Sequence, residues 1–213
     1  MKTILRKNLP VLLALATLIV AGCKDIVSVY PFCTEKDLVV APAFEGVWLA
    51  AETTNGVAGI EVKQASGGNY TLSPYPAGGT NSSPGETNVL EMRLFKLDDG
   101  LYLDFVSESE NCECIAIPPH CLFKVTELGS ALELRSLDYD WLRPFLKEHP
   151  EALRHLLKNP SDKDSDIILT ADTRELQQFL MKYAHVAEAF GTNGMLRWTR
   201  LAAGQKAQPL NKP

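Results

Sequence analysis

Short segments in which apolar and polar residues alternate fill the middle of the chain, and they limit its possible folds more than any other feature. The alternation recurs between Phe44 and Leu137, for example over residues 90–94, 101–105, 121–126 and 132–135. Turn-forming residues such as Asn55-Gly56 and Asp98-Asp99-Gly100 separate the segments. A period of two buries one face of each strand, which is typical of an antiparallel meander. Seven or eight strands at this spacing predict a barrel or a strongly curved sheet.

Helical patterns follow the strands. Asp140 is the expected N-cap of a short helix, and His149-Pro150 is expected to begin a second one with three leucines on one face. Asp172 and Glu175 form a capping box for the longest helix, whose apolar stripe runs from Leu176 to Phe190. Residues 195–201 are expected to form a last strand. The sequence therefore predicts an α+β fold in which C-terminal helices pack on an antiparallel β-meander.

The N-terminus has the order of a secretory signal peptide. Lys2, Arg6 and Lys7 precede an apolar run over residues 9–20, which is too short to cross a bilayer as a helix. Small residues and a cysteine then follow, in the order Val20-Ala21-Gly22-Cys23. This sequence resembles the lipobox of bacterial lipoproteins, which implies cleavage before Cys23 and attachment of lipid to its thiol. The alternative is a signal peptide that is cut elsewhere, with Cys23 an ordinary cysteine.

The lipobox also implies a location and a domain organisation. The residue after Cys23 is Lys24, not the Asp that retains such proteins in an inner membrane. The resemblance therefore implies a lipid anchor in the outer membrane and a domain on its periplasmic face. We expect a signal peptide at 1–22, a tether at 23–42, one β-rich domain with helices at 43–201 and a polar tail at 202–213.

Charge excludes one class of partner. The whole chain has 21 basic and 26 acidic residues, a net charge of -5. An acidic chain without a basic patch has no electrostatic footprint for nucleic acid or for anionic lipid head groups. The expected link to the membrane is therefore the N-terminal lipid.

Gly46 and Trp48 open the first expected strand. Their Gly-x-Trp pattern resembles the signature of lipocalins and other calycins, in which the Trp closes the barrel floor under an Arg from a late strand. The resemblance implies a calycin-like barrel, with Arg135, Arg197 or Arg200 as the arginine in question. The alternative is another antiparallel β-plus-helix fold in which Trp48 is an ordinary core residue.

Three further stretches, residues 34–48, 137–142 and 168–173, resemble a group of uncharacterised bacterial lipoproteins. This resemblance covers most of the chain after Cys23. It implies no activity and no functional residues.

Four cysteines remain after lipidation, namely Cys33, Cys112, Cys114 and Cys121. An even number in an oxidising compartment favours disulfides, and the short ring of a Cys112–Cys114 bridge favours pairing Cys33 and Cys121 with the other two. The alternative is a zinc site made by Cys112, Cys114, His120 and Cys121. Their spacing differs from that of common zinc sites, so we expect no metal and no cofactor.

No nucleophile elbow, zincin helix, phosphate loop or kinase signature occurs in the sequence. An enzyme is the weakest hypothesis, and a metal-dependent one would need a polar cluster near His120 and the cysteines. The first hypothesis is a membrane-anchored module that binds a small apolar ligand or a lipid. The second is a structural or partner-recognition envelope lipoprotein without a ligand cavity.

Overall fold

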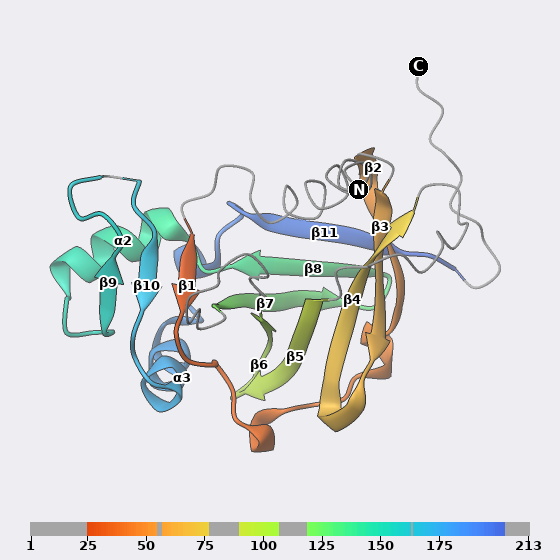
Figure 1. Ribbon diagram of the computed structural model, residues 1–213, viewed down its shortest axis with the longest axis horizontal. Helices are drawn as coiled ribbons and strands as arrows, with labels where there is room; N and C mark the ends of the chain where they lie inside the picture. The colour runs from red at the N-terminus through yellow and green to blue at the C-terminus, as the bar shows by residue number, and fades with distance from the viewer. Residues whose placement is uncertain (1–24, 55–56, 77–89, 107–118, 163, 203–213) are drawn as a thin grey trace, which may run out of the picture.

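The structure, a computed structural model, describes residues 25–54, 57–76, 90–106, 119–162 and 164–202. Within them, eight antiparallel strands form a closed barrel (Figure 1). In order around the barrel they are β2 (Gly46–Thr54), β3 (Val57–Gln64), β4 (Asn69–Pro76), β5 (Leu90–Leu97), β6 (Gly100–Val106), β7 (His120–Leu128), β8 (Ala131–Ser136) and β11 (Met195–Arg200). The strand β11 closes the barrel by pairing with both β8 and β2. The predicted antiparallel meander is therefore present, and it is a barrel.

Side-chain alternation along the strands gives the barrel an apolar interior. Leu94 pairs with Leu103, and Leu103 pairs with Phe123. Leu94 and Leu103 belong to one interior cluster that also contains Trp48, and Phe123 packs against it. Successive side chains in a strand point to opposite faces. On each barrel strand, the residues adjacent in sequence to these interior residues therefore face outward.

A three-stranded extension continues the barrel wall beyond β7. It consists of β1 (Ile26–Ser28), β10 (Ile167–Leu169) and β9 (His155–Leu157). Ser28 pairs with His120 of β7, β1 runs parallel to β10, and β10 pairs antiparallel with β9. The extension stands beside the helices, at the left of Figure 1.

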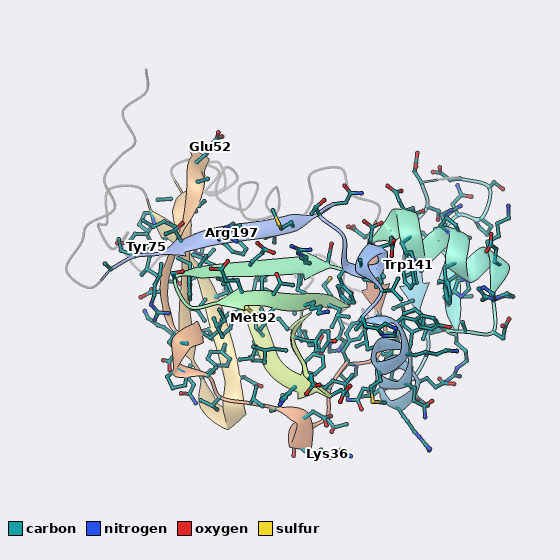
Figure 2. All side chains as sticks on the ribbon, turned by 180° about the vertical axis from the view of Figure 1, so that it is seen from behind. Lys36, Glu52, Tyr75, Met92, Trp141 and Arg197 are labelled. Atoms are coloured by element: carbon teal, nitrogen blue, oxygen red, sulfur yellow. The ribbon has the colours of Figure 1, made fainter. Side chains whose placement is uncertain are left out.

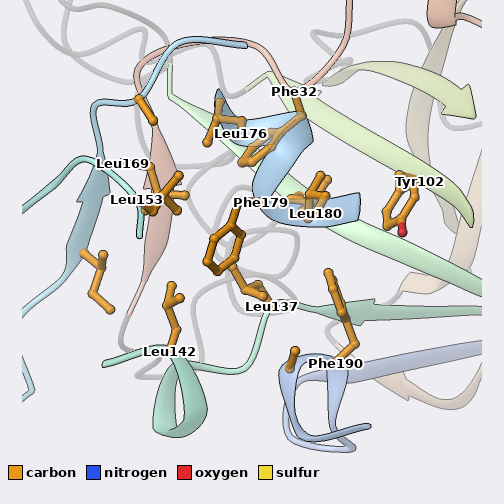
Figure 3. Packing of buried hydrophobic residues seen from close by; sticks show 14 of the residues in the cluster. Phe32, Tyr102, Leu137, Leu142, Leu153, Leu169, Leu176, Phe179, Leu180 and Phe190 are labelled. Atoms are coloured by element: carbon orange, nitrogen blue, oxygen red, sulfur yellow. The ribbon is translucent and has the colours of Figure 1, made fainter. Parts of the chain in front are cut away.

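A second apolar core lies outside the barrel (Figure 3). It is formed by α2 (Tyr139–Glu148), α3 (Thr173–Tyr183), the short 3-10 helix η4 (Ala187–Phe190) and the extension. The outward side chains of β5, β6 and β7 belong to the same cluster as the apolar face of α3, namely Phe95, Tyr102, Leu122, Leu176, Phe179 and Leu180. The wall made by β5–β7 is therefore buried on both faces.

The segment expected to be a tether, residues 23–42, packs against the rest of the domain from residue 25 onward. Phe32 and Cys33 are each only 2% exposed. Thr173 Oγ1 donates a hydrogen bond to Pro31 O at 2.7 Å, and Gln177 Nε2 donates one to Phe32 O at 3.1 Å. The short 3-10 helices η1 (Glu35–Asp37) and η2 (Pro42–Phe44) then lead to β2. Phe32 and Cys33 of this segment belong to the outer core, and Ile26 and Leu38 pack against it.

Helix α2 begins earlier than expected. Its N-cap is Asp138, whose Oδ1 accepts a hydrogen bond from the Trp141 N–H at 3.0 Å. Asp140 lies in the first turn instead. Both positions carry aspartate. The Asp138 N–H donates to Ala189 O at 2.8 Å, and this contact fixes the backbone so that the helix begins after Asp138.

The second short helix that we expected after His149-Pro150 is absent from the described residues. Residues 155–157 form β9, with Ile167 opposite Leu157. Leu156 is 60% exposed, whereas Leu153 is buried, so the leucines do not share one buried face. Three closely spaced leucines are compatible with a helix or a strand. Residues 155–157 form a strand because they pair with β10.

The longest helix has the predicted start but a different end. Asp172 and Glu175 form the expected capping box at the N-terminus of α3. The α-helix stops at Tyr183, and the last apolar residues of the expected stripe lie in η4.

Candidate functional site

One end of the barrel is closed by the residues of the Gly-x-Trp pattern. Trp48 is fully buried, and its Nε1–H donates to Phe44 O at 3.0 Å. The Arg200 guanidinium carbon lies 4.9 Å from the centroid of the Trp48 ring, within the range of a cation–π contact. Arg200 Nη1 and Nη2 also donate to Ala43 O and Glu45 O, each at 2.6 Å. Arg200 therefore ties the segment before β2 to the barrel floor.

Gly46 allows this close approach. Its φ is +126°, a backbone conformation that side chains with a Cβ rarely adopt. A Cβ at this position would also lie 3.3 Å from Arg200 Nη2. The glycine of the pattern is thus required by both its dihedral angle and the arginine beside it.

The other two candidate arginines lie on the outer surface of the barrel, and Figure 2 labels Arg197 there. Arg135 Nη2 lies 2.8 Å from Glu133 Oε1, and Arg197 Nη1 lies 2.6 Å from Glu133 Oε2. Hydrogen bonds from Thr126, then from Arg135 and Arg197, lower the pKa of the Glu133 carboxyl to about 2. The pairing register of β11 explains why Arg200 contacts Trp48 and Arg197 does not. Arg200 is opposite Trp48 on β2, whereas Arg197 is opposite Glu133 on β8.

The opposite end of the barrel lies away from Trp48 and Arg200. There β4 and β6 end and β5 and β7 begin. Four apolar side chains packed against the interior cluster at this end are only half-buried, namely Leu90, Phe105, Phe123 and Leu196. The Phe105 and Phe123 rings meet edge to face, with centroids 5.2 Å apart.

The apolar interior of the barrel is the candidate binding site. Its largest fully buried side chains include Trp48, Tyr70 and Phe44 at the closed end. Partly buried apolar side chains occur at both ends, since Leu101 and Leu128 lie where β6 begins and β7 ends. An interior lined by apolar side chains is the kind of surface that binds apolar molecules.

A polar cluster lies outside the barrel, between β6, β7 and the lead-in segment. Asp104 is fully buried, and His120 Nδ1 lies 2.9 and 3.0 Å from its two carboxylate oxygens. The Phe32 N–H also donates to Asp104 Oδ2, at 3.2 Å, and the Cys33 sulfur lies 4.0 Å from the same oxygen. Sequence reasoning missed Asp104 because it occupies a polar position of an alternating strand. Tyr102 and Leu122 lie on the same outward face as Asp104, and these two large side chains indicated that other residues cover this face.

The two described cysteines have no thiolate character at neutral pH. Burial, then the nearby Asp104, raises the pKa of Cys33 to about 12. Burial, then Asp25, raises the pKa of Cys121 to about 11. Both thiols are therefore protonated at neutral pH, and a protonated thiol is a poor nucleophile. Among the residues that the structure describes, no group of His, Cys, Asp and Glu is arranged to hold a metal ion.

Cys33 and Cys121 are free thiols in the structure, and the disulfides expected between them and Cys112 or Cys114 stay a prediction. Cys33 packs in the outer core, whereas Cys121 lies in the barrel wall on β7. Cys112 and Cys114 lie outside the described residues, as do Cys23, Asn55-Gly56 and most of the polar tail.

Comparison with protein-family models, with curated proteins and with solved structures found no match to this chain. Among the described helices, none is both long and apolar enough to span a membrane.

Proposed function

We propose that this chain is a lipoprotein, held in the outer membrane by lipid on Cys23, whose periplasmic barrel binds a small apolar molecule or a lipid. The observation that carries the binding proposal is the closed eight-stranded barrel with an apolar interior. One end of that interior is closed by Trp48 and Arg200.

Three features support a calycin-like barrel. The strands follow one another as a meander, α3 comes before the last strand, and the last strand returns to pair with the first. The Trp48–Arg200 contact at the closed end fits the Gly-x-Trp resemblance. Helix α2, between β8 and α3, is an addition to this plan.

The anchor is tested by processing of the precursor. Only a thiol at position 23 can accept the lipid, so Cys23→Ser should accumulate as an unprocessed precursor without lipid. Cys33→Ser is the matched control, and it should be processed and lipidated normally. Normal cleavage and membrane retention of Cys23→Ser would contradict the lipoprotein proposal.

Ligand binding is tested with a neutral fluorescent probe, N-phenyl-1-naphthylamine, on the delipidated chain. We expect saturable binding, and Phe105→Ser or Phe123→Ser should weaken it about tenfold because each removes apolar contact area. Met181→Ser is the control, since Met181 is 50% exposed on α3. Native mass spectrometry of protein purified without added ligand should also detect a co-purified apolar molecule.

The alternative is a partner-recognition lipoprotein without a ligand site. An aromatic cluster between α2 and α3 favours it, because Trp141, Phe145 and Tyr183 stay half-buried (Figure 2 labels Trp141). The Phe145 and Tyr183 ring centroids are 4.9 Å apart. Absence of any saturable probe binding would leave this alternative ahead.

A further inference from the structure

We infer that the domain rests directly on the membrane surface, with the exposed face of the three-stranded extension against the lipid head groups. This inference rests on the lipid anchor of the proposed function, and it adds which part of the fold that anchor holds at the membrane.

The first argument is the length of chain between the anchor and the folded domain. Cys23, the residue proposed to carry the lipid, is two positions before Asp25. Consecutive Cα atoms are about 3.8 Å apart, so the Cα of Asp25 lies within about 8 Å of that of Cys23 whatever conformation joins them. The head-group layer of one leaflet is itself roughly 5–8 Å deep. The anchor therefore holds Asp25 at the membrane surface.

The second argument is that Asp25 is already part of the fold. Its carbonyl accepts a hydrogen bond from the Ile167 N–H at 2.9 Å, and its N–H donates to Asp166 Oδ1 at 3.4 Å. The next residue, Ile26, pairs with Ile167 in the β1–β10 ladder. Because Asp25 is fixed to the extension, the start of β1 and the neighbouring loop between β9 and β10 lie at the membrane with it.

The third argument is an apolar row on the exposed face of the extension. Val27, Ile168 and Leu156 are register partners across β1, β10 and β9. Ile167 and Leu169 belong to the outer core, so alternation turns the row to the opposite face. Leu156 is 60% exposed, and the other two residues of the row are half-buried. Burial of such side chains in the head-group region strengthens membrane binding, and Val27 is only two residues from Asp25.

The charges beside the row identify the kind of lipid surface that it fits. Arg154 and Lys158 lie two positions before and after Leu156. Arg154 Nε donates to Glu175 Oε2 at 2.9 Å, and Lys158 Nζ lies 2.9 Å from Asp166 Oδ2. Each basic group is thus paired within the chain, so the face has no excess of positive charge for anionic lipids. A zwitterionic bilayer is the surface that it fits.

The figures show which residues lie far from this face. Strand β1 begins toward the upper side of Figure 1 and runs downward, and α3 and η1 lie lower. Figure 2 labels Lys36 of η1 at the lower edge of the molecule. Lys36 is therefore a reference position away from the proposed contact.

Site-specific quenching on vesicles tests the contact. The lipidated full-length chain is purified from membranes and placed in phosphatidylcholine vesicles that contain lipids with a nitroxide on the head group. A fluorescent maleimide is attached to Ser161→Cys, in the exposed loop between β9 and β10, or to Lys36→Cys. The label at Ser161→Cys should lose about half of its fluorescence, because the loop then lies at the head-group layer, and the label at Lys36→Cys should lose almost none.

Equal quenching at the two positions would overturn this inference while leaving the anchor in place. A chain that carries no lipid would overturn the anchor, and the inference with it. Both labelled chains also carry Cys112→Ser and Cys114→Ser. Cys33 and Cys121, whose pKa values are about 12 and 11, stay protonated and react slowly.

An insertion tests whether the short connection holds the domain at the membrane. Ten Gly and Ser residues between Lys24 and Asp25 form a flexible chain that spans roughly 17 Å. Quenching at Ser161→Cys should then fall about twofold, because the domain can move away from the head groups. No change on insertion would overturn the inference.

A charge substitution tests the apolar row. In the chain with the insertion, Leu156→Asp should lower the remaining quenching at Ser161→Cys to the level at Lys36→Cys. Leu156→Ser is a second variant in case the first does not fold, as checked by circular dichroism. Met181→Asp changes an exposed apolar residue on α3 and should keep the quenching. Equal quenching in the folded Leu156 variants and Met181→Asp would overturn the assignment of this face to the membrane.

Discussion

Trp48 combines three requirements at one position: an apolar ring for the barrel floor, a donor for the Phe44 carbonyl and a face for the Arg200 guanidinium. Arg200 is opposite Trp48 in the β2–β11 register, so the contact forms only when the last strand closes the barrel. The residue therefore links the first and last strands of the closed end.

Truncation of Trp48 should be costly. Trp48→Ala removes a fully buried ring, and such changes cost about 3–5 kcal/mol of unfolding free energy. At about 2–4 °C per kcal/mol for a chain of this size, the melting temperature should fall by about 6–20 °C. Trp141→Phe, at a half-buried ring that still stacks on Phe145, should cost less than about 1.5 kcal/mol. Thermal denaturation followed by circular dichroism compares them, and equal losses would show that Trp48 is not part of the barrel floor.

Glu133 should make stability depend on acid pH. Its pKa in the folded chain is about 2, below the ordinary value of 4.5, so the ionised form is favoured in the folded state. Its stabilising contribution is complete above about pH 4.5 and is lost as pH falls toward 2. Removing the charge-assisted hydrogen bonds costs roughly 1–3 kcal/mol, so Glu133→Gln should lower the melting temperature at pH 6.

The same variant should have a flatter melting temperature between pH 2 and 5 than the unmodified chain. Glu91→Gln, at an exposed position on β5, is the matched control. An identical slope in Glu133→Gln and the unmodified chain would show that Glu133 does not contribute to acid sensitivity.

At the scale of single elements, cap chemistry decides where helices begin. The capping box of Asp172 and Glu175 is contained in four consecutive residues, so the start of α3 was predicted from the sequence. The start of α2 was not, because Asp138 and Asp140 are equally suitable by type. The observed N-cap is the one whose carboxylate accepts the Trp141 N–H.

The two aspartates should differ in unfolding free energy. Asp138→Ala removes the N-cap of α2 and should cost about 1–2 kcal/mol. Asp140→Ala changes a charge in the first turn, where helix-dipole effects are about 0.3–1 kcal/mol. Urea denaturation measures both, and a larger loss for Asp140→Ala would contradict the assignment of the cap.

At the scale of the whole molecule, the N-terminal segment joins the barrel to the outer core. Strand β1 lies between β7 and β10, Phe32 donates to the buried Asp104, and Thr173 of α3 donates to Pro31. The segment is therefore a structural part of the domain.

A chain that begins at Thr34 should be much less stable than one that begins at Asp25. It lacks β1 and the buried Phe32 and Cys33, and each deleted large apolar side chain costs about 2–5 kcal/mol. We expect a melting temperature at least 10 °C lower, and faster amide exchange in α3 and β10 than in β2 and β3. Equal melting temperatures for the two chains are the result that a free tether would give.

The sequence by itself determined the features that depend on neighbouring residues. Alternation predicted the barrel strands, because consecutive side chains in a strand point to opposite faces. Gly46 and Trp48 marked the closed end, and Asp172 with Glu175 marked the start of α3. These signals need no knowledge of distant partners.

Only the tertiary structure decided which distant segments meet. Arg200, and not Arg135 or Arg197, contacts Trp48 because of the β2–β11 register. Pairing with β10 made β9 a strand, and the outer core buried Asp104 on a face that alternation had assigned to solvent. Burial depends on what covers a surface, and the segments that cover this one, residues 25–33 and α3, lie far from β6 in the sequence.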